Sequence, residues 1–141
     1  TEKIKINDIF FNIQKKLNNK NLDIEINNEI YLHGRRQALE RCFSNIIQNG
    51  LVYGNKVNIY AEKSLNRVVI LFQDDGPGIP PEHYRNVFKP FFRLDRSRSL
   101  NKSGVGLGLA IVEDIVNSHG GNIQLSKSPL NGLQVKISLP F

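Results

Sequence analysis

The chain has 141 residues, of which 40% are hydrophobic, and this is enough for one domain with a core between two layers of secondary structure. No apolar run approaches the roughly 18 residues of a membrane-spanning helix, and the single cysteine, Cys42, excludes an internal disulfide. The net charge of +6 would suit an anionic partner, but there is no zinc-ligand spacing, basic recognition helix or aromatic RNA-binding strand, so we expect no nucleic-acid binding.

The first part of the chain predicts two helices separated by two short strands. Apolar residues at helical spacing predict a helix from Asn7 to about Leu17. Alternating apolar and polar residues then predict a half-buried strand from Leu22 to Ile26, followed by a short strand from Ile30 to Leu32. From Arg35 to about Tyr53, apolar residues recur every three or four positions, which predicts an amphipathic helix that ends near Gly54.

The second part predicts a strand pair, a loop, a helix and two final strands. The strand pair is expected at Val57–Ala61 and Arg67–Phe72. The segment from Arg93 to Ser103 is polar and charged without a period, which indicates a long loop of the kind that often forms a lid. A second amphipathic helix follows from Leu107 to His119, where glycine ends it. The last strands are expected at about Asn122–Ser126 and Leu133–Leu139.

Two asparagines are candidates for a ligand site on the longer helix. Asn45 and Asn49 stand at i and i+4, so their amides project from one helix face. They can simply cap or solvate that face. However, Asn49 is adjacent to Gly50, which faces the predicted core, and a part-buried amide there needs hydrogen-bond partners. An amide oxygen also suits Mg²⁺, which prefers oxygen and keeps ligands from water and phosphate.

Asp74 is a candidate for reading a nucleotide base. The apolar run from Val68 to Phe72 predicts a buried strand that delivers this carboxylate into a loop with Gly76 and Gly78. A fixed carboxylate can accept a hydrogen bond from the amino group of adenine, whereas guanine offers a carbonyl there. The glycines leave room for a base to approach the backbone. An ordinary surface turn has the same composition, so the residues alone leave both interpretations open.

A second glycine-rich segment precedes the last predicted helix. Gly104, Gly106 and Gly108 stand where free backbone N–H groups and the positive end of the helix attract phosphates. The spacing is neither the dinucleotide fingerprint nor a Walker loop. A flexible hinge is the structural alternative, and the same glycines can serve both a lid hinge and a phosphate site.

Together these motifs, in this order, strongly resemble the catalytic and ATP-binding domain of bacterial sensor histidine kinases. This domain belongs to the wider family of gyrase B, Hsp90 and MutL, the GHKL family, and within it the chain looks most like the EnvZ-type kinases. The resemblance covers nearly the whole chain. The matching segments are an N box at Asn45-Ile46-Ile47-Gln48-Asn49 with Tyr53, a G1 box at Asp74-Asp75-Gly76-Pro77-Gly78, an F box at Phe88-Lys89-Pro90-Phe91-Phe92-Arg93 and a G2 box at Gly104 to Gly108.

The resemblance implies ATP and Mg²⁺ as cofactors and assigns roles to individual residues. Asn49 is implied to be the Mg²⁺ ligand, Asn45 to lie near the phosphates and Asp74 to read adenine. Tyr53 would line the base pocket, and Arg93 would help to hold the γ-phosphate, so that Asn45, Asn49 and Arg93 form the catalytic group. The residues implied at the nucleotide are Asn45, Asn49, Tyr53, Asp74, Gly76, Gly78, Ile79, Phe88, Arg93, Arg98, Gly104, Val105, Gly106, Leu107 and Gly108.

Three positions bear on the activity that the resemblance implies. Val52 stands where these kinases often carry a Lys or Arg directed at the phosphates, so one cationic contact is absent. Gly50 replaces the usual small alanine, at a cost to helix stability on the order of 1 kcal/mol. Asn45 stands where the ATPase relatives have a glutamate that activates water, and an amide cannot act as that base. We therefore expect slow hydrolysis and transfer of the γ-phosphate to a histidine supplied from outside.

The same resemblance implies an α+β fold, a two-layer α/β sandwich of the Bergerat type, with a mixed sheet of about five strands, three helices on one face and an ATP lid. Because the chain begins with Thr1 and lacks methionine, we expect residues 1–141 to be one domain excised from a longer protein. The implied partners are its own dimerisation domain, which carries the acceptor histidine, and a response regulator. We expect the fragment to be monomeric and cytoplasmic, and the parent to be a dimeric inner-membrane receptor.

Two other functions remain open from the sequence. The first is a nucleotide-binding regulatory or scaffold module, in which ATP orders the lid without phosphotransfer, and Val52 is its best support. The second is an ATPase of the gyrase or Hsp90 branch, against which Asn45 and the short chain argue. Phosphotransfer to a supplied acceptor domain separates the kinase from the first, and steady hydrolysis would revive the second.

Overall fold

The computed structural model describes residues 1–90 and 108–141. The helices are α1 Ile6–Leu17, α2 Arg36–Tyr53 and α4 Gly108–Ser118, with short 3₁₀ helices η1 Pro81–His83 and η2 Asn86–Phe88. The strands are β1 Glu2–Lys5, β2 Leu22–Ile26, β3 Tyr31–Gly34, β4 Val57–Lys63, β5 Arg67–Asp74, β6 Asn122–Lys127 and β7 Leu133–Pro140. These bounds agree to within two residues with those predicted for the same elements.

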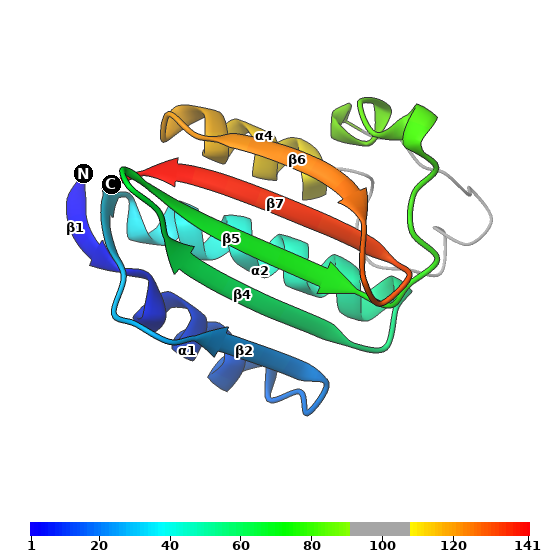
Figure 1. Ribbon diagram of the computed structural model, residues 1–141, viewed down its shortest axis with the longest axis horizontal. Coiled ribbons are helices and arrows are strands. Elements are labelled where there is room, and N and C mark those ends of the chain that lie inside the picture. Colours follow the sequence, from blue (N-terminus) through cyan, green and yellow to red (C-terminus); the bar gives the residue numbers. More distant parts are fainter. Residues whose placement is uncertain (91–107) are drawn as a thin grey trace.

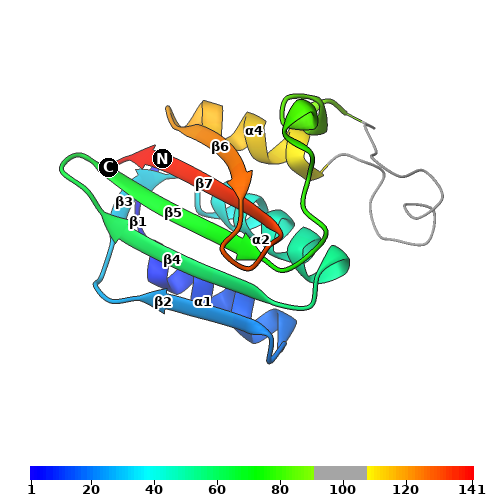
Figure 2. The ribbon, with the colours of Figure 1, turned by 45° about the vertical axis from the view of Figure 1, so that its right-hand side comes forward.

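Five strands form one mixed sheet in the order β2-β4-β5-β7-β6. Strands β2 and β4 run parallel, and each of the other neighbouring pairs is antiparallel. Helices α1, α2 and α4 all lie on one face of this sheet, behind it in Figure 1, and the turned view in Figure 2 shows no described helix over the opposite face. The expected two-layer sandwich of five strands and three helices is therefore confirmed.

Alternation along the central strands explains this arrangement. In β4, β5 and β7, every second side chain is apolar and buried toward the helices, while the residues between them are polar or only half-buried. A one-residue shift of register would turn the apolar set to solvent, so the helix layer fixes the register. The buried residues are Val57, Ile59 and Ala61, then Val68, Ile70 and Phe72, then Val135, Ile137 and Leu139.

Three phenylalanines join the two layers at the centre of the core. Phe10 of α1 stacks on Phe43 of α2, with ring centroids 4.9 Å apart, and Phe72 of β5 lies tilted against both rings. Such aromatic contacts add to the gain from burying apolar surface. Cys42 lies in the same core, and burial raises the pKa of its thiol to about 12, so it is a packing residue without thiolate chemistry.

One strand was missed by the sequence prediction. Strand β1 pairs with β3 in a separate antiparallel ribbon, with Ile4 opposite Leu32. Only Ile4 of its four residues is fully buried, so the segment is too short for a recognisable alternation. The expected lid segment, residues 93–103, lies outside the described part of the chain.

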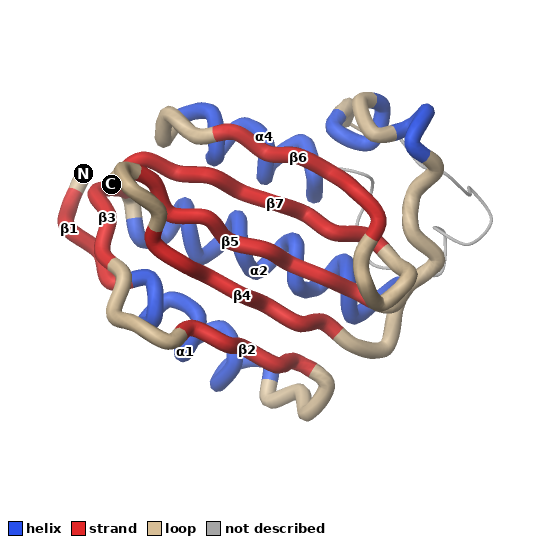
Figure 3. Tube along the Cα trace, viewed as in Figure 1, coloured by secondary structure: helices blue, strands red, loops and turns tan. Residues whose placement is uncertain are grey.

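The candidate ligand segments gather at one end of the molecule. The C-terminal end of α2, the loop that follows β5, the turn between β6 and β7 and the start of α4 lie at the right-hand end in Figure 3, whereas both chain termini lie at the other end. The sequence separation between these segments is large, so the topology of the sheet brings them together.

Candidate functional site

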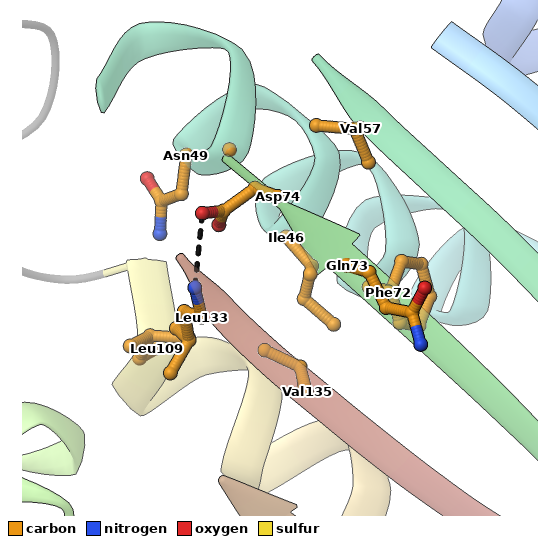
Figure 4. A pocket seen from close by; sticks show the side chains of 10 residues that line it. Ile46, Asn49, Val57, Phe72, Gln73, Asp74, Leu109, Leu133 and Val135 are labelled. Atoms are coloured by element: carbon orange, nitrogen blue, oxygen red, sulfur yellow. Dashed lines mark hydrogen bonds between the residues drawn. The ribbon is translucent and has the colours of Figure 1, made fainter. Parts of the chain in front are cut away.

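A pocket opens at this end of the molecule between the sheet and two helices. Its empty volume, which includes space open to solvent, is about 320 Å³. Most of its lining is apolar, and Asp74 supplies the charged group (Figure 4). The lining residues are Ile46, Asn49, Gly50, Val57, Phe72, Gln73, Asp74, Leu109, Leu133 and Val135.

Asp74 is the last residue of β5, and its carboxylate is held by two backbone N–H groups. Its Oδ1 accepts from Gly76 N at 2.9 Å and from Leu133 N at 3.0 Å. Burial is the main influence on this group and raises the pKa of Asp74, while the two backbone hydrogen bonds act in the opposite direction. The carboxylate is thus fixed in orientation and partly desolvated, the two properties that a base-reading group needs.

The neighbouring Asp75 accepts hydrogen bonds from the backbone outside the pocket. Its side chain is outside the pocket, and its Oδ1 accepts from Asn55 N at 2.7 Å and Lys56 N at 2.8 Å. These backbone hydrogen bonds lower the pKa of Asp75. Asp75 therefore ties the loop after β5 to the chain that leaves α2, which places the end of α2 beside the pocket.

Two glycines permit the close packing around Asp74. A Cβ at Gly50 would lie 2.6 Å from Val57 Cγ2 and 3.3 Å from Asp74 Cβ, so α2 approaches β4 and β5 more closely than an alanine would permit. A Cβ at Gly132, in the turn before β7, would overlap Asp74 Oδ1 and the Asp74 carbonyl oxygen. Gly50 was predicted to lower the stability of α2, and the close contact of α2 with Val57 and Asp74 is the structural reason for a glycine at this position.

Asn49, which lines the pocket, and Gly108 at the start of α4 are direct neighbours. A Cβ on Gly108 would lie 3.2 Å from Asn49 Nδ2, so α4 begins directly beside the Asn49 side chain. Asn45 lies one turn earlier on α2, half-buried, and does not line this pocket. The structure thus brings Asn49, Asp74 and Gly108 together, and Asn45 is near them without contributing to this wall.

The other predicted residues that the structure describes are not among those that line the pocket. Tyr53 is the last residue of α2 and is 40% exposed. Gly76, Gly78 and Ile79 lie in the loop after β5, where Gly78 has a φ of +74° that favours glycine. Phe88 ends η2 and is half-buried. Six predicted residues lie outside the described part of the chain: Arg93, Arg98, Gly104, Val105, Gly106 and Leu107.

The sequence prediction missed the contribution of the β6–β7 turn and of the first turn of α4. Leu133 supplies a backbone donor to Asp74, Gly132 makes room for it, and Leu109 and Val57 form apolar walls. The Asn131-Gly132 pair indicated a turn, and Asn131 does adopt a positive φ of 77°. No local pattern indicates that this turn contacts a loop more than fifty residues earlier.

Residues 34–141 match the model of the family described as histidine kinase-, DNA gyrase B- and HSP90-like ATPases. The chain belongs to this family. The match includes both glycine-rich segments and all of the predicted nucleotide residues.

Curated relatives from bacteria narrow the similarity to sensor kinases. The chain is 40% identical over 111 residues to the sensor histidine kinase CpxA of Escherichia coli, covering 78% of this chain and 24% of that protein. It is 41% identical over 109 residues to the sensor protein RstB of the same species, covering 74% of this chain and 24% of that protein. The chain therefore spans about a quarter of the length of these relatives.

Solved structures match over nearly the full chain. The mycobacterial sensor histidine kinase MprB superposes with a TM-score of 0.85 at 24% identity, covering 99% of this chain and 96% of that one, which shows the shared fold. The histidine kinase domain of the E. coli osmosensor EnvZ superposes with a TM-score of 0.75 at 31% identity, covering 99% and 88%. The fold and the resemblance to sensor histidine kinases that the motifs predicted are both confirmed.

Proposed function

We propose that this pocket binds the adenine of ATP and that Asp74 selects it. The observation that carries the proposal is a carboxylate held by two backbone donors at the edge of an apolar pocket. A carboxylate accepts from the amino group of adenine and rejects the carbonyl of guanine, since two acceptors would then face each other without a proton. A relative of the same fold at 25% identity, from Mycobacterium tuberculosis, is described as the ATP-binding domain of PrrB, which supports this ligand.

Asn49 is the proposed Mg²⁺ ligand. Its amide lies at the pocket mouth beside Gly108, and an amide oxygen is a ligand type that Mg²⁺ accepts. Within residues 1–90 and 108–141, no group of three or more His, Cys, Asp or Glu is arranged to hold a metal. An ion held by Asn49 would accordingly take its other ligands from phosphate and water, and it would neutralise charge on the phosphates.

We further propose that residues 1–141 act as the catalytic domain of a sensor histidine kinase. The γ-phosphate would pass to a histidine on a dimerisation domain elsewhere in the full protein, and from there to an aspartate of a response regulator. The names and matched segments of CpxA and RstB support this assignment. Asn45 and Arg93 are proposed to act at the phosphates, and the parent protein is proposed to be a dimeric inner-membrane receptor. No helix in the part of the chain that the structure describes is long and apolar enough to cross a membrane.

Calorimetric titration tests the pocket. ATP should bind the 141-residue chain in the presence of Mg²⁺, and GTP should bind at least tenfold more weakly, the scale of one hydrogen bond to a charged group. Asp74→Asn should reduce this selectivity. Asp23→Asn is the matched control, because it removes the same charge from an exposed position on β2 that does not line the pocket. Absence of ATP binding, or equal binding of GTP, would overturn the proposal.

A regulatory module without phosphotransfer is the second candidate, and Val52 favours it because a cation is often found there in the kinases. Mixing the chain and radiolabelled ATP with a separately produced acceptor domain separates the two functions. Label on the acceptor histidine supports the kinase. ATP binding without label on any supplied acceptor supports the regulatory module, whereas steady hydrolysis by the chain alone indicates an ATPase.

A further inference from the structure

His119 connects the far ends of the two helices that form the pocket. It follows the last residue of α4, and its Nδ1 lies 2.8 Å from the carbonyl oxygen of Ile115. Its Nε2 lies 3.1 Å from the backbone N of Arg35, the residue that precedes α2. The sequence indicated only a histidine at a helix end, whereas the structure shows that both ring nitrogens are engaged.

These two partners fix the state of the ring. The Ile115 carbonyl can only accept, so Nδ1 must donate, and the Arg35 N–H can only donate, so Nε2 must accept. This combination exists only in the neutral imidazole with its proton on Nδ1. A proton on Nε2 would face the Arg35 N–H and remove that hydrogen bond.

The backbone around His119 holds the ring in place. Helix α4 ends with Gly120 at a φ of +74°, and Gly121 N donates to Val116 O at 3.0 Å, which is the pattern of a Schellman motif. On the other side, a Cβ at Gly34 would lie 2.8 Å from the His119 ring, so the ring packs directly against the end of β3. The contact therefore joins the β1–β3 ribbon, the start of α2 and the end of α4.

The two helices run antiparallel, so the His119 contact and the pocket lie at opposite ends of the same pair. At one end, Arg35 and His119 are bonded. At the other end, Asn49 of α2 faces Gly108 of α4, and Leu109 lines the pocket. A helix is a stiff element, so we expect a change in the position of α4 at His119 to be transmitted to the contact between Gly108 and Asn49.

We propose that His119 is a positioning residue for nucleotide binding: by bonding the start of α2 to the end of α4, it sets the width of the pocket between Asn49 and Leu109. The inference rests on the proposed function, the binding of ATP in this pocket. His119, Arg35 N and Ile115 O are called the His119 bridge below. Protonation of His119 opens the bridge, which makes the width of the pocket dependent on pH.

Two arginines, Arg35 and Arg36, lie next to the bridge. The guanidinium of Arg35 donates to Ser118 Oγ at 2.6 Å, next to the ring. Arg36 lies 3.7 Å from Glu2 on the neighbouring ribbon, so that carboxylate is already paired. A doubly protonated ring would bring Nε2–H against the Arg35 N–H and a positive charge beside the Arg35 guanidinium, so it cannot form the same bridge.

The first test needs no nucleotide. Long-range ¹H–¹⁵N NMR of the histidine rings should show His119 with its proton on Nδ1 near pH 7.5, a neutral value at which free imidazole is uncharged. In His119→Ala, the side-chain amide resonances of Asn49 should shift, although Asn49 is at the other end of α2. The amide of Asn7 on α1 is the internal control and should stay unchanged. An unchanged Asn49 would overturn the proposal, whether or not ATP binds.

The second test measures ATP affinity against pH. His119→Ala should raise the Kd about two- to tenfold, the range of one net hydrogen bond. In the wild type, the Kd should be higher at a pH that is low enough to protonate the ring, because protonation opens the bridge. His119→Gln offers an acceptor to Arg35 that does not titrate, so its affinity should be near that of the wild type and its pH profile should lack the histidine component.

Controls separate this role from general destabilisation. Ile24→Ala also removes apolar contacts with the core, but Ile24 lies on β2, at the edge of the sheet opposite to β6, the strand that contacts α4. This variant should lower thermal stability without changing the Kd or the Asn49 resonances. If Ile24→Ala changes them as much as His119→Ala does, or if His119→Gln keeps the wild-type pH profile, the proposal is wrong. If the wild type does not bind ATP, the proposed function fails, and the NMR test still decides the bridge.

Discussion

Asp74 and Asp75 are adjacent in sequence, yet their carboxyl groups lie in opposite environments. Burial raises the pKa of Asp74, whereas backbone hydrogen bonds from Asn55 and Lys56 lower the pKa of Asp75. A group whose folded pKa is raised stabilises the fold below its unfolded pKa, and this contribution is lost as pH rises. A group whose folded pKa is lowered, such as Asp75, stabilises the fold above its unfolded pKa, and this contribution is lost as pH falls through the folded pKa. The first carboxylate is therefore kept at a cost to stability, as expected of a functional group.

Asp74→Asn should stabilise the nucleotide-free protein at neutral pH while weakening ATP selectivity. The amide oxygen can still accept from Gly76 and Leu133, but no charge is desolvated. We expect a gain of about 0.5 to 1 kcal/mol in the free energy of unfolding at pH 7, the scale of single stabilising changes. The gain should vanish toward pH 3, below the ordinary pKa of about 3.9, because Asp74 is then neutral in both states. Urea titrations across pH measure this difference.

Asp75→Asn provides the contrasting result. Its stability should be lower than that of the wild type at pH 7, because the charged acceptor for Asn55 N and Lys56 N is lost, and the deficit should shrink as pH falls through the folded pKa of Asp75. Opposite pH trends for the two variants are expected. The same trend for both would show that Asp74 is not penalised by burial.

At the scale of elements, the contact of α2 with the sheet depends on a glycine that helix propensity alone disfavours. Gly50→Ala should gain up to about 1 kcal/mol from helix propensity. Its new Cβ would nevertheless meet Val57 Cγ2 at 2.6 Å, and overpacking of this kind costs about 1 to 3 kcal/mol. We expect a net loss of about 1 kcal/mol in the free energy of unfolding, together with weaker ATP binding, because α2 is displaced from Asp74.

A double-mutant cycle measures whether Val57 is the cause. Val57→Ala removes the methyl group that meets the new Cβ, so Gly50→Ala should be less harmful in that background than in the wild type. The two single changes should thus combine with a favourable coupling of about 1 kcal/mol. Additive effects would indicate that the clash is relieved elsewhere, by movement of the Asp74 main chain.

The turn between β6 and β7 is the second element on which the pocket depends. In Gly132→Ala, the new Cβ would overlap Asp74 and lie 2.6 Å from Gly76 N, so the turn must move away and withdraw Leu133 N from the carboxylate. We expect a loss of about 1 to 3 kcal/mol in stability and reduced discrimination against GTP. Asn131→Gly is the control in the same turn. Its φ of 77° suits glycine, so it should change stability by less than about 1 kcal/mol.

Across the whole molecule, the sequence predicted the elements that have a clear period and the residues that carry a motif. Helices α1, α2 and α4 and the five strands of the main sheet were found because each contains apolar residues at helical or alternating spacing. Strand β1, with Ile4 as its one fully buried residue, has too little pattern. The hydrogen bonds of Leu133 to Asp74 and of His119 to Arg35 join residues that are 59 and 84 positions apart, and no local sequence pattern indicates such long-range contacts.

Because the pocket is built from both layers, bound nucleotide should stabilise the whole fold. Its walls come from α2, α4, β4, β5 and β7, and unfolding of the sheet or of either helix destroys it. A ligand that binds only the folded state at a hundredfold excess over its Kd adds about 2.7 kcal/mol. For a domain of this size, that gain corresponds to roughly 8 to 11 °C in Tm. Calorimetric scans with increasing MgATP should show this rise.

The comparison with GTP and with Asp74→Asn makes the result specific to the pocket. GTP at the same concentration should raise the Tm of the wild type less than ATP does, and the difference between the two nucleotides should shrink in Asp74→Asn. Hydrogen exchange then distinguishes global from local effects. Protection by ATP should extend to β5 and β7 in the sheet, since these strands supply Asp74 and Leu133. Protection confined to the start of α4 would mean that the nucleotide orders one helix end and does not bind in the pocket between the two layers.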